Sequence, residues 1–89
     1  QSELRFFSEM VIDYSKREVS INGTPVNLSK KEFDIVELLS LNAGQVFDRE
    51  RIYEAVWGLD GEGNSDTIME HIRKIRSKFT ALSGYKWNG

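Results

Sequence analysis

Residues 65–79 decide the fold of this chain; they read S-D-T-I-M-E-H-I-R-K-I-R-S-K-F. At roughly 100° per residue, four apolar side chains of this stretch fall on one narrow stripe of a helix, namely Ile68, Ile72, Ile75 and Phe79. Polar residues occupy the opposite side of the same helix, namely Glu70, Arg73, Lys74 and Ser77. The pattern predicts a helix over residues 65–80 that is buried along one side and exposed along the other.

The charge of the chain changes sign along its length. The 89 residues carry 12 lysines and arginines and 14 aspartates and glutamates, for a net charge of −2. All the acidic residues lie at or before Glu70, whereas five of the basic residues lie after His71. A basic side on one helix of an otherwise acidic domain attracts a polyanion to that face and orients the protein toward it. The alternative is a merely solvated surface, which any core-facing helix needs on its outer side.

Length and composition exclude several classes of protein. A chain of 89 residues is long enough for one compact domain, here residues 1–89. The absence of cysteine excludes disulfides and thiolate metal sites, and it suits a reducing cytoplasm, where we expect the protein. No apolar run approaches the roughly 18 residues of a membrane span, and the N-terminus lacks the order of a secretory signal. With one histidine and no phosphate-binding glycine motif, we expect no enzyme, no cofactor and no metal site.

Residues 1–28 show strand character. Short runs rich in β-branched and aromatic residues alternate with turn residues, which predicts a small antiparallel sheet. Asn22-Gly23 between two such runs predicts a tight hairpin, because both residues tolerate positive φ. Pro25 lacks a backbone donor, so its strand should begin there or lie at an edge.

Two further helices are predicted between this sheet and residue 65. Ser29 and Glu32 form a capping box at the start of a core helix over residues 29–43, whose acids we interpret as a solvated surface, namely Glu32, Asp34 and Glu37. Asp48 caps a second helix over residues 48–58, with three side chains facing inward, namely Ile52, Ala55 and Val56. Residues 58–64 form a glycine-rich loop, and residues 85–88 form a terminal strand.

Four segments in this order resemble the effector domain of OmpR/PhoB-type response regulators. They are L-S-K-K-E-F-D-I-V-E-L-L from residue 28, V-F-D-R-E-R-I-Y-E-A-V-W-G from residue 46, T-I-M-E-H-I-R-K-I-R-S-K-F from residue 67 and G-Y-K-W from residue 84. The resemblance implies an α+β winged helix-turn-helix with an N-terminal antiparallel sheet, three helices and a C-terminal hairpin wing. It implies sequence-specific binding to double-stranded DNA at direct-repeat sites, by tandem or dimeric copies that regulate transcription. It also implies a phosphorylated receiver domain, which these residues do not contain.

The resemblance also assigns roles to individual residues. The side chains that read bases in the family correspond here to Met69, Glu70 and Lys74. Those that contact phosphates correspond to Trp57, Thr67, His71, Arg73 and Arg76. The loop that lies near RNA polymerase in the family corresponds to Leu59, Asp60, Gly61 and Glu62. Each of these roles has a purely structural alternative. His71 can simply pack at the side of its helix, Trp57 is foremost a core residue, and the loop can be a plain connector.

This chain departs from the family pattern at three places. Many relatives have an arginine where Asp66 stands, and they often have an acid where Met69 stands. An aspartate suits a helix N-terminus but not a phosphate, and a methionine can touch a thymine methyl but cannot accept from cytosine, so sequence preference should differ. Residues 80–83 are too few for a wing strand and turn. Either the wing is shortened or residues between Ser83 and Tyr85 are missing from this sequence, and we favour the second.

A competing function belongs to another class. A winged helix can serve as a protein-interaction module, with its basic face bound to an acidic partner. Salt titration against DNA separates the two, because the logarithm of DNA affinity falls with the logarithm of salt at about −0.9 per neutralised phosphate.

Overall fold

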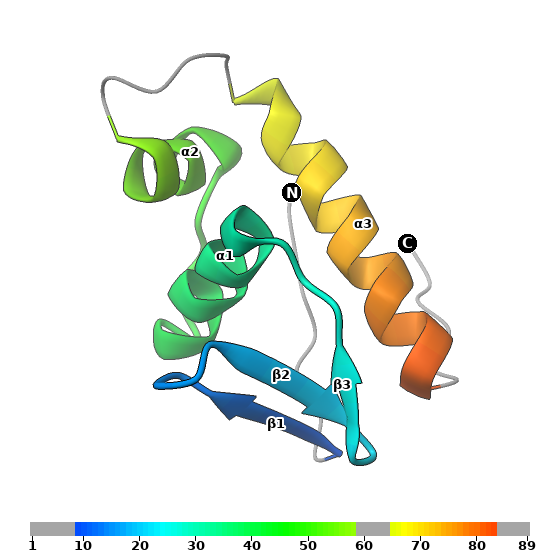
Figure 1. The fold of residues 1–89 in the computed structure, drawn as a ribbon. Coiled ribbons are helices and arrows are strands. Elements are labelled where there is room, and N and C mark those ends of the chain that lie inside the picture. The colour runs from blue at the N-terminus through cyan, green and yellow to red at the C-terminus, as the bar shows by residue number, and fades with distance from the viewer. Residues whose placement is uncertain (1–8, 59–64, 84–89) are drawn as a thin grey trace.

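The computed structural model describes residues 9–58 and 65–83. Within these ranges, the strands β1 (Met10–Asp13), β2 (Glu18–Ile21) and β3 (Thr24–Val26) are followed by the helices α1 (Lys30–Leu41), α2 (Arg49–Trp57) and α3 (Asp66–Ser83). Figure 1 shows α1 in the middle, with the sheet on one side of it and α2 on the other, and α3 running alongside. The predicted α+β order of a sheet followed by three helices is confirmed.

The sheet is antiparallel, with strand order β1-β2-β3. Its register places Val19 of β2 between Ile12 and Val26, so that apolar side chains share the face toward the helices. Asn22 and Gly23 have φ values of 53° and 81°, as the predicted hairpin requires. Within the described sheet β3 is an edge strand, which accommodates Pro25 as expected. The first part of the segment predicted to form strands, residues 1–8, lies outside the described residues.

The capping box of α1 is present. The Oγ of Ser29 accepts from the backbone N–H of Glu32 at 3.2 Å, and Oε1 of Glu32 accepts from the backbone N–H of Ser29 at 2.9 Å. Glu32 is nevertheless only 4% exposed, so its interpretation as a solvated residue is wrong. Its carboxylate turns back over the first turn of α1, where α3 covers it. Leu41, in the last turn of the same helix, is 62% exposed and does not join the core.

Helix α2 begins and ends at its predicted signals. Oδ1 of Asp48 accepts from the backbone N–H of Arg51 at 2.8 Å, and Gly58 ends the helix with φ 80°. Ile52 is buried and Val56 partly buried, as predicted. Ala55 is exposed, contrary to prediction, because it lines an open hollow between α1 and α2 and not the closed core.

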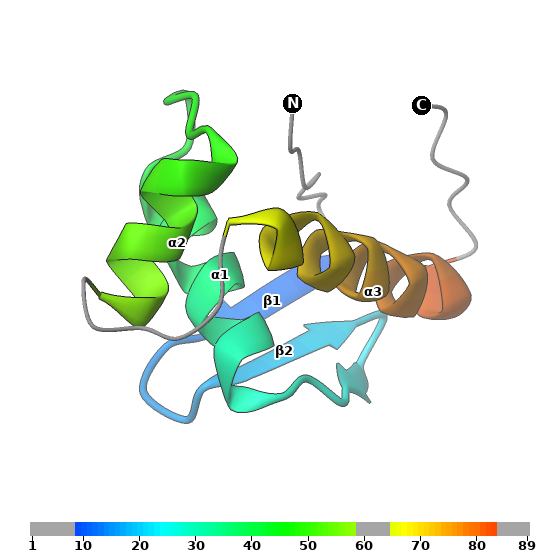
Figure 2. The ribbon, with the colours of Figure 1, turned by 90° about the horizontal axis from the view of Figure 1, so that it is seen from above.

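Helix α3 is the longest helix in the described ranges and contacts α1, α2, β2 and β3. Its predicted stripe is confirmed, since the four side chains are 0–1% exposed, namely Ile68, Ile72, Ile75 and Phe79. Figure 2 shows α1 and α2 grouped at the N-terminal end of α3, whereas the rest of α3 extends over the strands.

The helix α3 also runs three residues beyond its predicted end, to Ser83. Leu82 packs partly against the core, which extends the apolar contact by another turn. Residues 80–83 are therefore helical and contribute no strand to a wing. The predicted loop at residues 59–64 and wing strand at residues 85–88 lie outside the described residues. None of the helices in the described ranges is long and apolar enough to cross a bilayer.

Candidate nucleic-acid interface

The outer side of α3 is the candidate interface. The apolar stripe holds the helix on the core, and the side chains opposite the stripe face solvent, namely Glu70, Arg73, Lys74 and Ser77. Met69, beside them, is 39% exposed. The three residues predicted to read bases therefore all lie on the accessible part of the helix, namely Met69, Glu70 and Lys74. Their contacts with bases remain predictions.

The predicted phosphate contacts lie along both borders of this outer side. At roughly 100° per residue, Thr67 and His71 fall on the border that faces α2, whereas Arg76 falls on the opposite border. Arg73 lies between the borders, nearer to Arg76. The structure thus brings together a strip of exposed side chains with hydrogen-bond donors or cations on either flank.

Arg73 forms an ion pair with Glu70, one turn earlier on the same helix. The two side chains are 68% and 59% exposed, so water surrounds the pair. A surface pair at this spacing stabilises a helix by only about 0.2–0.5 kcal/mol. A phosphate can therefore replace Glu70 as the partner of Arg73 at little cost to the fold.

Arg76 is less accessible than Arg73. Its side chain is half-buried, and its Nε atom is fully covered. The inner part of the Arg76 side chain is therefore covered along the border of the helix.

Trp57 joins α2 to α3 through an aromatic cluster. Its ring stacks on Tyr53 at 5.1 Å between centroids and meets the ring of His71 edge-on at 5.2 Å. The indole is half-buried, so it contributes to packing while part of its surface stays accessible. Core packing and a contact with a phosphate are therefore compatible for Trp57.

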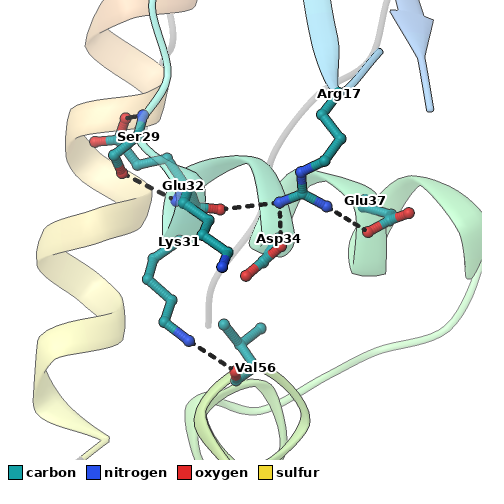
Figure 3. Close-up of polar contacts among 8 residues, drawn as sticks. Arg17, Ser29, Lys31, Glu32, Asp34, Glu37 and Val56 are labelled. Carbon is teal, nitrogen blue, oxygen red and sulfur yellow. Dashed lines mark hydrogen bonds and ion pairs between the residues drawn. The ribbon is translucent and has the colours of Figure 1, made fainter. Parts of the chain in front are cut away.

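Lys31 fixes the end of α2 beside this cluster. Its Nζ donates to the carbonyl oxygen of Val56 at 3.1 Å and lies 5.1 Å from the centroid of the Trp57 ring. Figure 3 shows the Lys31 side chain crossing from α1 to the last turn of α2. A cation at a helix C-terminus satisfies an unpaired carbonyl and complements the helix dipole. The sequence alone did not indicate this role, because the two residues are neighbours only in the folded chain.

His71 is oriented by its own helix. Its Nδ1 lies 2.8 Å from the carbonyl oxygen of Thr67, one turn earlier. A carbonyl oxygen can only accept, so Nδ1 carries a hydrogen and donates it.

Arg49 and Asp66 link the first turns of α2 and α3. Their side chains form an ion pair at 3.3 Å, in which both are largely exposed. Asp66 also lies in the first turn of α3, where a negative charge is favourable. Many relatives have an arginine at the position of Asp66. In this chain, Arg49 of α2 places a cation beside that position. Sequence reasoning did not identify Arg49.

A covered ion pair connects α1 to the C-terminal half of α3. The Nζ of Lys78 donates to Oε1 of Glu32 at 2.6 Å. Burial alone would raise the pKa of Glu32, but the hydrogen bonds from Lys78 and from the backbone of Ser29, with the charge of Lys78, lower that pKa on balance. Lys78 is thereby used within the fold and does not belong to the exposed cationic strip.

The other two acids of α1 form ion pairs with the turn of the β1-β2 hairpin. Arg17, in the turn between β1 and β2, forms ion pairs with Asp34 and Glu37, as Figure 3 shows. These acids therefore help to attach the hairpin to α1, which the interpretation as a solvated surface did not include.

Comparison with known proteins identifies the family. The sequence model of the family "Transcriptional regulatory protein, C terminal" matches residues 23–86. The chain belongs to this family. Among proteins similar to this effector domain is the transcriptional regulatory protein SpaR of Bacillus subtilis, 38% identical over 93 residues that cover 93% of the chain and 42% of SpaR. The sensory transduction protein RegX3 of Mycolicibacterium smegmatis is 40% identical over 67 residues, 75% of the chain and 29% of RegX3. The effector domain thus spans less than half the length of these relatives.

Solved structures share its fold. The RstA DNA-binding domain of Klebsiella pneumoniae, in complex with the RstA box, matches with a TM-score of 0.71 and 29% identity over 84% of this chain and 74% of that one. The C-terminal effector domain of BfmR from Acinetobacter baumannii matches with a TM-score of 0.68 and 36% identity over 83% and 68%. The predicted OmpR/PhoB-type family, its winged-helix fold and its role as a transcription-regulating effector domain in two-component systems are confirmed. The family is one of regulators and not of enzymes.

Proposed function

We propose that this effector domain binds double-stranded DNA sequence-specifically by laying the outer side of α3 in the major groove. The observation that carries the proposal is the division of α3 into a fully buried apolar stripe and an exposed side with Arg73 and Lys74. A major groove about 12 Å wide admits one α-helix, provided that the helix is supported from behind. The core supports α3 in this way along its length.

Three side chains are suited to read base edges. Lys74 can donate to the acceptors of a guanine, and Glu70 can accept from the amino group of a cytosine. Met69 offers an apolar surface to a thymine methyl. Each residue lies on the exposed part of α3, and Lys74 lies one helical turn beyond Glu70, so these two would meet different base pairs.

Phosphate contacts would flank these base contacts. Trp57, Thr67 and His71 lie along the border of α3 that faces α2, where they would meet one DNA strand. Arg73 and Arg76 lie toward the other border and would meet the opposite strand. Such contacts set the position and orientation of a protein on the duplex without reading its sequence.

Binding experiments at several salt concentrations test the proposal. We expect selection from a random duplex pool to yield a defined half-site, and affinity for it to fall with salt at about −0.9 per phosphate contact. Arg73→Gln should reduce this slope by about 1, whereas the exposed and distant Lys16→Gln should leave it unchanged. Failure to select any sequence, together with capture of an acidic protein on the same face, would support the alternative function as an interaction module.

The full-length context belongs to the same proposal. From the resemblance to OmpR/PhoB-type response regulators, and because the chain spans less than half the length of SpaR and RegX3, we propose that this domain is joined to a phosphorylated receiver domain and acts as paired copies on direct repeats in the cytoplasm. The acidic loop at residues 59–62 would contact RNA polymerase. If replacing Asp60 and Glu62 by alanine leaves promoter activation unchanged while DNA binding persists, the contact with polymerase is excluded.

A further inference from the structure

His71 is the only histidine of the 89-residue sequence, and its hydrogen bond within α3 limits what it can offer to DNA. Because Nδ1 donates its hydrogen to the carbonyl oxygen of Thr67, a neutral ring carries only a lone pair at Nε2. A phosphate oxygen also carries lone pairs and cannot donate. The neutral ring therefore has no hydrogen for a phosphate, whereas the protonated ring has an Nε2–H that can donate.

We propose that DNA binding by this domain is coupled to the uptake of a proton by His71. The coupling rests on the proposed function, since it requires that the border of α3 with Thr67 and His71 meets the DNA backbone. Binding then favours the protonated ring, and by linkage a lower pH favours binding. The domain would hold promoter DNA more tightly as the pH falls from 8 to 6.

Within the described residues, the charged groups around His71 do not already accept a hydrogen bond from Nε2, so a phosphate can stabilise the protonated ring. From α1, Glu32 attracts the ring, but its carboxylate is bound by Lys78 at 2.6 Å. Lys31, also from α1, lies 5.1 Å from the centroid of the Trp57 ring and donates to the carbonyl oxygen of Val56 on α2.

The other acid next to His71 in the described part of the chain is Glu70, which directly precedes it and is paired with Arg73. Helix α2 contributes the neutral ring of Trp57, with Tyr53 stacked behind it. On α3 itself, the neighbours one turn away are Thr67 and the cationic Lys74. Because Glu32 and Glu70 are already paired with Lys78 and Arg73, a phosphate placed at this border would be an unpaired anion to which an imidazolium could donate.

The composition of the chain makes the coupling easy to isolate. Histidine is the side chain whose ordinary pKa places its change of charge between pH 5 and 8. With one histidine and no cysteine in the sequence, a change of DNA affinity in this range points to a single side chain. The phosphodiesters of DNA do not titrate there.

Equilibrium binding across pH tests the proposal. The probe is a fluorescent duplex that carries the half-site from the random-pool selection, at constant ionic strength. We expect wild-type affinity to rise severalfold from pH 8 to pH 6, toward the limit of about tenfold that a one-unit difference in proton affinity between free and bound protein sets. His71→Gln, which retains amide donors but cannot titrate, should bind with the same affinity across this range. Lys74→Gln, one turn further along α3 on its outer side, should bind more weakly but keep the full pH dependence.

The imidazole signal in NMR spectra provides a readout independent of affinity. One histidine yields one titrating ring, and we expect its titration midpoint to be higher in the DNA complex than in the free protein. Wild-type affinity that is unchanged by pH, or a pH dependence that persists in His71→Gln, would overturn the coupling while leaving DNA binding intact. A protein that binds no duplex at any pH would instead overturn the proposed function, and the coupling with it.

Discussion

The two sides of α3 differ in polarity and in burial. The inner side carries isoleucines and a phenylalanine that are 0–1% exposed, and the outer side carries polar and charged residues that face solvent. Burial of the inner side fixes where the helix lies, because each such side chain contributes about 1.5–3 kcal/mol that depends on close packing. The outer side contributes little to stability and is available to a ligand. Changes on the inner side should therefore unfold the domain, whereas changes on the outer side should alter binding alone.

The largest effect is expected from Ile72→Ala, in the middle of the inner side. Removing its buried methyl and methylene groups leaves a cavity beneath the reading helix and should cost about 2–5 kcal/mol of unfolding free energy. Urea denaturation measures this loss, and the milder Ile72→Val, at about 0.5–1.5 kcal/mol, provides a second point if the alanine variant does not fold. A variant that keeps its stability but loses DNA binding would show that the inner side takes a direct part in binding.

Lys74→Ala tests the outer side. We expect the preference at one base pair of the half-site to weaken by about 1–3 kcal/mol, because a lysine that donates to a guanine is lost. Arg73→Ala should instead weaken binding to the selected and to random duplexes equally. Competition binding measures both. Equal, sequence-independent losses from the two variants would remove Lys74 from the base contacts, and unfolding of either variant would show that the outer side is structural.

Glu32→Gln tests the covered ion pair that joins α1 to Lys78 of α3. Because the folded-state pKa of Glu32 lies below its ordinary value of 4.5, its ionised form contributes stability above about pH 4.5, and that stability is lost as the pH falls through the lowered pKa. We expect the variant to lose about 1–2 kcal/mol at neutral pH, where a covered hydrogen bond to Lys78 is weakened. Its melting temperature should also fall less steeply than that of the wild type below pH 4.5. If the melting temperatures of variant and wild type fall in parallel with pH, the link between α1 and α3 is not electrostatic.

The smallest effect is expected from Glu70→Gln. Its ion pair with Arg73 is exposed, so the free energy of unfolding should change by less than about 0.5 kcal/mol. Thermal melting at neutral pH measures this. A loss of more than about 1 kcal/mol would mean that the outer side of α3 stabilises the fold after all.

Much of the fold could be predicted because its signals are local. The stripe of α3, the capping box at Ser29, the cap at Asp48 and the hairpin at Asn22 all depend on residues within one or two turns of each other. The errors occurred where distant segments decide. Ala55 matches the inward pattern of α2 but lines an open hollow between α1 and α2, where packing is not closed. The candidate interface was predicted through the family register, yet Arg49, Lys31 and the reduced access of Arg76 became apparent only in the structure.

The sequence by itself determined which residues form helices and strands, which side of each helix is apolar, and where positive charge gathers, because these follow from backbone propensities and periodicity. Only the tertiary structure decided which charges remain available to a ligand. Lys78 and Glu32 lie 46 residues apart in the sequence but 2.6 Å apart in space, so a lysine of the basic segment and one predicted surface anion are used within the fold. Attraction between charges depends on distance through space, and the packing of α3 on α1 sets that distance.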